Sequence, residues 1–300
     1  MRTIKGGIAF FDSGIGGLTV LAECRKQLPN TLFYYYGDNK HAPYGNLPPQ
    51  KIKKYVFRVF KRFQRLRVWA AVVACNTATA VCIEELRDKF SFPIIGVEPA
   101  ILPAVRKGGE VFVLTTRATY ESSRFRNLCK NAQTLFPDAR VRLFPCDGLA
   151  GTMESHIFEK DYDYTPLLPK GSPDGVVLGC THYVYIAEQI KAFYGCPIFD
   201  GNQGISRRLS YLLSENFTPN EHRQPPDDHF QPFSPQKPLK KECDTAKIGV
   251  GAQSKKAKRL MFGAKVLRRK KAKKGVKKGK IVFLGGYRKH NKHVYEQMFV

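Results

Sequence analysis

The amino-acid sequence predicts an α/β fold built from mostly parallel sheets that are covered by helices. Over the first 215 of the 300 residues, short runs rich in β-branched and aromatic residues alternate with longer amphipathic stretches. This alternation is typical of strand–helix–strand units, whose helices cover both faces of a parallel sheet. The apolar fraction of 43% is ordinary for a globular protein and excludes a wholly disordered chain.

The expected elements fall into two series. In the first series we expect helices at 18–27, 49–65 and 78–89, and strands at 8–11, 32–36 and 70–74. In the second series we expect helices at 121–135 and 184–193, and strands at 93–97, 111–115, 140–145, 175–178 and 197–199. Ligands of such sheets bind beyond the carboxyl ends of the strands, so the residues that directly follow each strand are the candidate site residues.

Positive charge is concentrated at the C-terminal end. Residues 1–215 carry 28 Lys and Arg against 19 Asp and Glu, and residues 216–300 carry 22 against 6, which gives net charges of +9 and +16. Between residues 255 and 280, 14 of 26 residues are basic. We place a boundary near Asn216 and predict a basic tail over 216–300 that is disordered or transiently helical, because like charges bury little apolar surface. A short apolar run at 281–284 is either one strand or unstructured.

The tail has two interpretations. In the first, its positive charge makes weak contact with nucleic acid, a ribosome or an anionic lipid surface. In the second, it is a solvated extension without a partner. No apolar run approaches the ~20 residues that cross a bilayer, and the N-terminus lacks the apolar stretch and cleavage site of a signal peptide. We therefore expect a cytoplasmic protein without a membrane span. The eight cysteines show no C-x-x-C pair and no zinc-ligand spacing, so we expect reduced thiols and no metal site.

Two cysteines follow predicted strands in matching settings. Strand 70–74 leads into the sequence CNTAT, which begins at Cys75, and strand 175–178 leads into GCTHY, which contains Cys180. Each thiol is expected beside Asn or Thr side chains and helix-start N–H groups, which favour anions and lower a thiol pKa. A single strand-end cysteine is more often a small packing residue. A matched pair 105 residues apart instead indicates a shared function.

A glycine-rich turn, DSGIGG, follows the first strand and begins at Asp12. It lacks the Gly-Lys-Ser/Thr of a P-loop and the glycine spacing of a dinucleotide fingerprint. Asp12 suits a substrate ammonium group or a thiol proton, and it suits a helix N-cap equally well.

Two further loops carry polar side chains at strand ends. The loop after strand 32–36 combines a carboxylate, an imidazole and a phenol with a glycine, and we interpret it as facing the substrate: Asp38, His41, Tyr44 and Gly45. The turn after strand 111–115 supplies hydroxyls that suit a carboxylate ligand, from Thr115, Thr116 and Thr119.

Together these loops imply a small substrate that carries carboxylates and an amine. They show no signature of pyridoxal phosphate or of a nucleotide, so we expect no cofactor. Two opposed thiols are what cofactor-free inversion of an amino acid requires. One thiolate removes the α-proton, while the other thiol delivers a proton to the opposite face.

The order of these motifs resembles the glutamate racemase branch of the cofactor-independent aspartate/glutamate racemase family. The resemblance covers about residues 4–215 and ends in a closing helix at 207–213. It rests on FDSGIGGLTV (11–20), YGDNKHAPYG (36–45), ACNTAT (74–79), GVEPA (96–100), GCTHY (179–183) and DGN (200–202).

The resemblance implies two similar α/β domains related by pseudo-twofold symmetry, with the active site in the cleft between them. Residues 1–98, completed by a returning helix at about 203–215, would form the first domain, and residues 99–202 the second. It further implies glutamate as substrate, a homodimer, and a supply of D-glutamate for peptidoglycan.

The resemblance also assigns roles to single residues. Cys75 would be the base toward D-glutamate and Cys180 the base toward L-glutamate, with Asp12 and His182 assisting proton transfer. The implied substrate-binding residues are Asp12, Ser13, Tyr44, Gly45, Asn76, Thr77, Thr116, Thr119, Thr181 and His182.

Three points stay open in the sequence. Family members often carry an assisting Glu in a Leu-Val-Glu segment ahead of the second cysteine, whereas residues 145–154 read PCDGLAGTME here. Asp147 or Glu154 would have to take that place, and spacing does not choose between them. Aspartate racemase, or a related two-cysteine enzyme of the hydantoin or maleate type, is the first alternative function. The second is an inactive scaffold whose basic tail binds nucleic acid.

Overall fold

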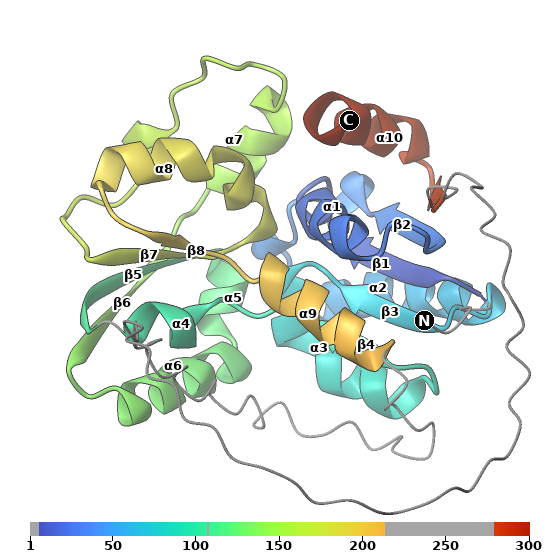
Figure 1. Cartoon of the computed structure of the whole chain (residues 1–300), viewed down its shortest axis with the longest axis horizontal. Helices are drawn as coiled ribbons and strands as arrows, with labels where there is room; N and C mark the ends of the chain where they lie inside the picture. Colours follow the sequence, from blue (N-terminus) through green and yellow to red (C-terminus); the bar gives the residue numbers. More distant parts are fainter. Residues whose placement is uncertain (1–5, 107, 214–278) are drawn as a thin grey trace, which may run out of the picture. The chain divides into compact units, whose positions relative to one another are not determined.

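The computed structural model describes residues 6–106, 108–213 and 279–300, and their strands form two sheets with parallel pairing throughout. The first sheet contains, in spatial order, β4 (Ile94–Gly96), β3 (Ala70–Val73), β1 (Ile8–Asp12), β2 (Phe33–Gly37) and β9 (Ile281–Phe283) (Figure 1). The second sheet contains β6 (Ala139–Pro145), β5 (Gly109–Thr115), β7 (Gly175–Gly179) and β8 (Ile198–Phe199).

The two sheets repeat one strand order. In the first sheet the order β2-β1-β3-β4 corresponds, strand for strand, to β6-β5-β7-β8 in the second. Cys75 lies two residues after the end of β3, and Cys180 directly follows β7, which is the equivalent strand. The similarity of the two thiol-bearing sequences therefore reflects a repeated architecture, and the predicted α/β class with two similar parallel sheets is confirmed.

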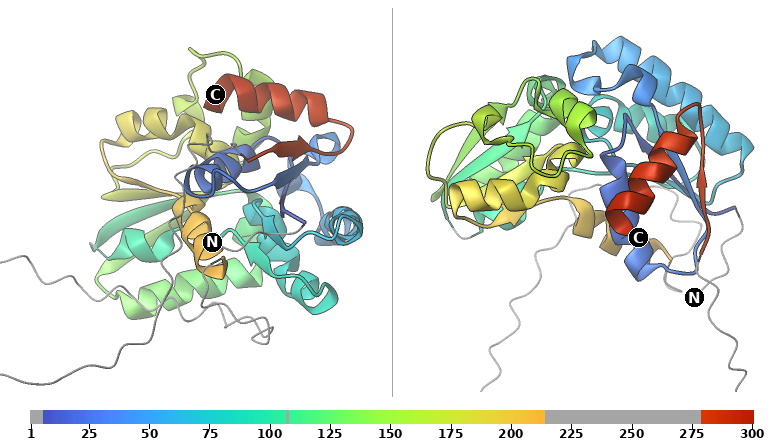
Figure 2. Two further views of the ribbon diagram at one scale, coloured as in Figure 1. Left: turned by 45° about the vertical axis from the view of Figure 1, so that its right-hand side comes forward. Right: turned by 90° about the horizontal axis from the view of Figure 1, so that it is seen from above.

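Helices cover both faces of the first sheet. Alternate residues of β1 face opposite ways, since Ile8 and Phe10 belong to one buried cluster and Ala9 and Phe11 to the other. The first cluster is closed by α1 (Gly17–Gln27), α9 (Asn202–Leu212) and α10 (Arg288–Phe299). The second is closed by α2 (Pro49–Arg65) and α3 (Asn76–Lys89), and Figure 2 shows the two groups from two further directions.

The second sheet is covered in the same way. Phe112 and Leu114 of β5 face α7 (Leu149–His156) and α8 (Ala187–Tyr194), while Val111 and Val113 face the helices of the opposite side. These opposite helices are α4 (Ile101–Val105), α5 (Arg117–Glu121) and α6 (Ser123–Leu135). Short 3-10 turns complete the loops at Asn39–His41 (η1), Tyr44–Asn46 (η2), Thr165–Leu167 (η3) and Thr181–Ile186 (η4).

The expected strands and long helices lie within a few residues of the observed ones. No sequence pattern predicts α4, α5 or α7. Helices α4 and α5 have five residues each, which is too short to show a helical period. Helix α7 contains Gly151 and Thr152, which are poor helix formers. The expected closing helix is α9, whose Ile205, Leu209 and Leu212 are buried against the first sheet and α1.

The prediction of one basic tail over 216–300 is wrong for its last 22 residues. Residues 279–300 include β9, which pairs with β2, and α10, whose Val294 and Tyr295 are buried in the first core cluster. Ile281–Phe283 supply enough apolar surface to extend a sheet. The prediction missed this strand because it is short and follows a long, strongly basic stretch. The rest of the predicted tail, residues 216–278, lies outside the described residues. Within the described ranges, none of the helices combines the length and the apolar character needed to cross a membrane.

Candidate active site

Loops from the carboxyl ends of both sheets meet and are joined by hydrogen bonds. Thr181 Oγ1, after β7, donates to Asp12 Oδ2 at the end of β1 over 3.2 Å. The backbone N–H of Ile15 donates to Glu154 Oε1 of α7 over 3.1 Å. Both sheets belong to one compact unit, so these bonds bring the two thiol-bearing strand ends to a common site.

The glycine-rich turn after β1 allows this close approach. A side chain at Gly14 would collide with the carboxylate of Glu154, and one at Gly16 would collide with the hydroxyl of Thr181. Gly14 and Gly16 are therefore required by the loops of the second sheet that pack on the turn.

Cys75 is the N-cap of α3 and is 5% exposed. Its Sγ accepts a hydrogen bond from the backbone N–H of Ala78 over 3.5 Å and lies 3.6 Å from Ser13 Oγ, to which it can donate. Burial, together with the nearby charge of Asp12, raises the pKa of the Cys75 thiol to about 12. The expectation that this position lowers the thiol pKa is wrong for Cys75, because desolvation outweighs the N–H group of the helix start.

Asp12 is fully buried, and its charge acts on the Cys75 thiol. Its Oδ1 accepts the backbone N–H of Gly14 over 2.9 Å, and its Oδ2 accepts the hydroxyl of Thr181. Burial raises the pKa of the Asp12 carboxyl above its ordinary value, although the charge of His182 acts in the opposite direction. Asp12 is thus a buried carboxyl that can hold or release a proton near Cys75.

Cys180 lies against a buried imidazole. Its Sγ is 3.7 Å from Nδ1 of His182, and Nε2 of His182 is 2.7 Å from Oε1 of Glu154. Burial lowers the pKa of His182, but hydrogen bonds to Cys180 and Glu154 outweigh it and raise that pKa well above its ordinary value. Burial likewise raises the pKa of Glu154, but the contact with His182 outweighs it and lowers that pKa overall. The result is a cysteine–imidazolium–carboxylate row.

The structure distinguishes the two candidate carboxylates. Glu154 projects from α7 onto His182 and is mostly buried, whereas Asp147 is half-exposed and forms an ion pair with Arg117, with 3.0 Å between Arg117 Nε and Asp147 Oδ2. Of the two carboxylates, only Glu154 contacts His182. The sequence alone does not distinguish Asp147 from Glu154, because no sequence pattern predicts the helix at 149–156 that carries Glu154 to His182.

Three threonine hydroxyls gather where the first and second sheets meet. Thr77 Oγ1 of α3 lies 2.9 Å from Thr116 Oγ1 and 3.2 Å from Thr119 Oγ1, and the last two are 3.1 Å apart. Thr116 is the N-cap of α5. Close by in sequence, Asn76 is buried and its Oδ1 has no hydrogen-bond partner among the described residues. These groups offer several hydroxyls and one free carbonyl oxygen.

The loop after β2 approaches this threonine cluster through Gly45. A Cβ atom at Gly45 would lie 2.7 Å from Cβ of Thr116, so only glycine fits. The hydroxyl of Tyr44 donates to Asp38 Oδ2 over 2.7 Å, and Nδ1 of His41 lies 2.9 Å from the same oxygen. Asp38 therefore orients Tyr44 and His41, and the hydrogen bonds of His41 within the described residues lead to Asp38 and not to either thiol.

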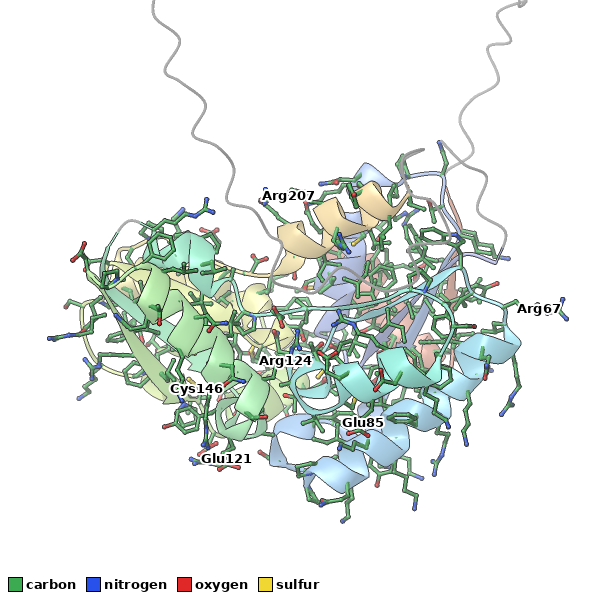
Figure 3. All side chains as sticks on the ribbon, turned by 90° about the horizontal axis from the view of Figure 1, so that it is seen from below. Arg67, Glu85, Glu121, Arg124, Cys146 and Arg207 are labelled. Carbon is green, nitrogen blue, oxygen red and sulfur yellow. The ribbon has the colours of Figure 1, made fainter. Side chains whose placement is uncertain are left out.

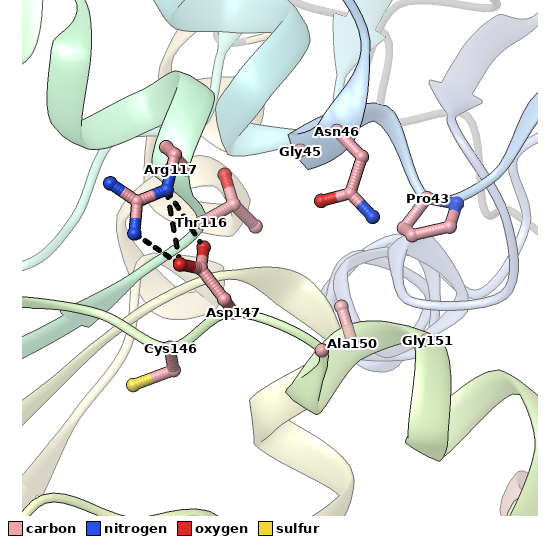
Figure 4. Close-up of a pocket in the computed structure, with 10 residues that line it drawn as sticks. Pro43, Gly45, Asn46, Thr116, Arg117, Cys146, Asp147, Ala150 and Gly151 are labelled. Atoms are coloured by element: carbon pink, nitrogen blue, oxygen red, sulfur yellow. Dashed lines mark hydrogen bonds and ion pairs between the residues drawn. The ribbon is translucent and has the colours of Figure 1, made fainter.

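A surface pocket lies beside the threonine cluster (Figure 4). It is lined from the first sheet's loops by Pro43, Gly45 and Asn46, and from the second by Thr116, Arg117 and residues 146–148, 150 and 151. Gly45 and Thr116 are two of the implied substrate-binding residues, while neither Cys75 nor Cys180 lines the pocket.

Two tyrosines outside the sequence motifs fix the glycine-rich turn. The hydroxyl of Tyr35 donates to the carbonyl oxygen of Gly14 over 2.8 Å, and that of Tyr185 donates to the carbonyl oxygen of Ile15 over 2.8 Å. Tyr35 comes from β2 and Tyr185 from η4, so the turn is held from both sheets. No sequence pattern singles out either tyrosine, because each acts through a backbone carbonyl that only the fold brings near.

Comparison with known proteins identifies related sequences. Residues 19–207 match the family described as Asp/Glu/Hydantoin racemase. A glutamate racemase of Clostridium botulinum (strain Hall) is 40% identical over 228 residues, which are 72% of this chain and 87% of the relative. A glutamate racemase of Clostridium acetobutylicum is 37% identical over 231 residues, with the same two coverages.

Solved structures give a matching result. Escherichia coli glutamate racemase in complex with L-glutamate and the activator UDP-MurNAc-Ala is 33% identical with a TM-score of 0.63, covering 69% of this chain and 82% of that one. Glutamate racemase isoform RacE1 from Bacillus anthracis is 30% identical with a TM-score of 0.60, covering 70% and 83%. The enzyme from Campylobacter jejuni, at 21% identity and a TM-score of 0.64, covers 97% of both chains and supports the fold alone.

Proposed function

The chain belongs to the Asp/Glu/hydantoin racemase family, and we propose that it interconverts L- and D-glutamate through the thiols of Cys75 and Cys180. The activity is that of an amino-acid racemase, an isomerase. One observation carries the proposal: equivalent strands of two similar sheets each end in a buried cysteine, and the loops that follow are hydrogen-bonded to each other. D-glutamate made in this way would supply peptidoglycan synthesis, as the family resemblance implies.

On the Cys180 side, the charge state of the row favours proton removal. An imidazolium at His182, held by the carboxylate of Glu154, lies against Cys180 Sγ and would stabilise the negative charge that this sulfur carries during proton transfer. The Cys180 thiolate would take the α-proton of one enantiomer, which by the resemblance is L-glutamate. The C–H electron pair remains on the α-carbon until a proton arrives at the opposite face.

On the Cys75 side, the resting group is a thiol. Its raised pKa keeps the proton on sulfur at neutral pH, so Cys75 is ready to donate. It would donate to the α-carbon and become a thiolate, which Ser13 Oγ and the backbone N–H of Ala78 can stabilise. For the reverse reaction the two sulfurs exchange roles, and the buried carboxyl of Asp12 would assist proton transfer at Cys75.

The polar groups between the loops suit the ends of an amino acid. The unpartnered Oδ1 of Asn76 is an acceptor that suits the substrate ammonium group. The hydroxyls of Thr77, Thr116 and Thr119 are donors that suit a carboxylate. Tyr44, Gly45, Ser13 and Thr181 complete the proposed substrate-binding set.

Glutamate is proposed over aspartate and over the hydantoin-type or maleate-type substrates because the similar proteins of 30–40% identity are named glutamate racemases. The direct test is circular dichroism of purified protein with L-glutamate, and separately with L-aspartate, without added cofactor. We expect the signal of glutamate alone to decay to zero. Decay of the aspartate signal alone would show that aspartate, and not glutamate, is the substrate. No decay with either amino acid would overturn the proposal. The inactive-scaffold alternative is not favoured, since both thiols retain polar partners.

Three accompanying expectations stay predictions. A homodimer is expected by analogy with the family, and analytical ultracentrifugation of the full chain would test it. Weak contact between the basic residues 255–280 and nucleic acid or another anionic surface is tested by salt-dependent binding. A cytoplasmic location is tested by fractionation of the producing cell.

A further inference from the structure

The outer face of α2 carries a basic surface that has no part in the site described above. The 17 residues of α2 include seven Lys and Arg and no Asp or Glu. The apolar residues of the helix face the first sheet and are buried: Ile52, Val56, Val59, Phe60 and Phe63. The opposite face is exposed and basic, and we call it the α2 surface: Lys51, Lys54, Arg58, Lys61, Arg62 and Arg65.

The charges of the α2 surface form one stripe. Lys51, Lys54, Arg58, Lys61 and Arg65 are separated by three or four residues, which places them above one another along the helix. At a rise of 1.5 Å per residue the stripe is about 21 Å long. Figure 3 shows Arg67, just beyond the end of the helix, pointing away from the fold.

No acidic side chain neutralises the stripe among the residues that the structure describes. Lys53, which lies at the side of the helix, is paired with Glu85 of α3. No ion pair is found there for any member of the α2 surface, and Arg58 instead lies over the ring of Tyr55. Like charges three and four residues apart destabilise a helix. The fold does not need these charges, because burial of the apolar face fixes α2, so the stripe is available to an anionic partner.

We propose that the α2 surface binds nucleic acid through the phosphate backbone, without reading sequence. A stripe of about 21 Å is long enough to contact several phosphates of a nucleic-acid backbone, and its charge is opposite to theirs. A membrane fits less well, because helices that lie on bilayers insert their apolar face, and the apolar face of α2 is buried in the core. Tyr55, an aromatic residue of α2, does not offer a free ring face for base stacking on this side, because its ring is stacked on His41 with the ring centroids 3.8 Å apart.

The place where the most basic sequence joins the fold supports this assignment. Lys280, the last residue of the basic run 255–280, is exposed and directly precedes β9. Val282 of β9 packs on the same buried cluster as the apolar face of α2. The described end of the run, Lys280, therefore leads into a strand that shares this cluster with α2. The proposed surface consists of α2 residues alone, which makes its contribution separable from that of the run.

The test is fluorescence anisotropy of a short labelled DNA duplex with the full-length protein over a series of salt concentrations. The variant carries Lys54→Gln, Lys61→Gln and Arg65→Gln. The matched control carries Lys130→Gln, Lys160→Gln and Lys170→Gln, which are exposed residues of the second sheet's domain and remove the same charge. Racemisation of glutamate and the circular dichroism spectrum are recorded for each protein, because none of these residues belongs to the proposed catalytic site.

We expect the α2 variant to bind about tenfold more weakly than the control at 0.1 M salt. The slope of log K against log salt should fall by about 2 to 3, because each phosphate that is no longer neutralised lowers it by about 0.9. Equal affinities and slopes in variant and control would overturn the proposal and assign any binding to residues 255–280. Retention of wild-type protein by vesicles of phosphatidylcholine and phosphatidylserine, at salt where the duplex does not bind, would also overturn it in favour of a lipid surface.

Discussion

Nε2 of His182 lies 2.7 Å from Oε1 of Glu154, and the same oxygen accepts the backbone N–H of Ile15. One carboxylate therefore orients the imidazole behind Cys180 and also holds the turn that follows Asp12. The two sides of the proposed reaction are coupled through this single group. A substitution at Glu154 should consequently affect proton transfer more than substrate affinity.

Glu154→Gln is predicted to lower kcat for glutamate racemisation by about 10- to 100-fold with a small change in KM, because the imidazolium loses its counter-charge. Asp147→Asn is the matched control, since Asp147 is a half-exposed partner of Arg117. Its kcat should stay within about twofold of wild type. Circular dichroism of L- and D-glutamate measures both variants. An equal loss of kcat in Asp147→Asn would contradict the assignment of Glu154.

The His182–Glu154 contact should make stability depend on pH in a defined window. The pKa of Glu154 is lowered from 4.5, so its contribution is present above pH 4.5 and is lost as pH falls through the folded pKa. The pKa of His182 is raised from 6.5, so its contribution is complete below pH 6.5 and is lost as pH rises through the folded pKa. The Tm difference between wild type and Glu154→Gln should be largest between pH 4.5 and pH 6.5. In that window the contact contributes about 2 kcal/mol to the free energy of unfolding. A difference that does not vary with pH would refute this linkage.

Asp12→Asn is predicted to abolish most activity and yet to stabilise the fold near neutral pH. The folded pKa of Asp12 is raised from 3.8 by burial, so ionisation of this carboxyl costs stability above pH 3.8. Asparagine keeps an oxygen for the N–H of Gly14 and removes the buried charge. We expect Tm at pH 7 to rise by a few degrees, which in a chain of this length corresponds to a gain of about 1 kcal/mol in the free energy of unfolding. This gain should disappear in acid. A lower Tm at pH 7 would argue against this interpretation.

Thr77→Val is predicted to raise KM for glutamate about tenfold, because it removes one hydroxyl from the proposed carboxylate site. Thr79→Val on the same helix is the control, since among the described residues the buried Thr79 hydroxyl bonds the backbone oxygen of Val73 and no other group. Both variants should lose about 1 kcal/mol of stability. Steady-state kinetics and thermal melts separate the two effects, and an equal rise of KM in Thr79→Val would exclude a substrate role for the cluster.

The sequence alone was sufficient to locate both thiols. Cys75 and Cys180 directly follow buried runs of four or five apolar or glycine residues, and the carboxyl ends of parallel strands gather by geometry at one edge of a sheet. The glycine-rich turn was also located, although the reason for its glycines is visible only in the loops that pack on it.

Three features depended on tertiary structure. Glu154 is seven residues from Asp147 and of the same chemical type, so only the path of α7 shows which carboxylate reaches His182. β9 is three residues long, and its pairing with β2 spans more than 240 positions of sequence, which local periodicity does not report. The thiol pKa of Cys75 depends on desolvation, which the N-cap position by itself does not determine.

The central claim is that two sulfurs act on opposite faces of one α-carbon. The most direct measurement is racemisation of L-glutamate in ²H₂O, stopped early, with the deuterium content of each enantiomer determined by mass spectrometry after chiral separation. The two-thiol account predicts deuterium at the α-carbon of the D-glutamate formed and almost none in the remaining L-glutamate, and no racemisation by Cys75→Ser or Cys180→Ser. Deuterium entering the remaining L-glutamate as fast as the product, or racemisation that survives either substitution, would contradict it.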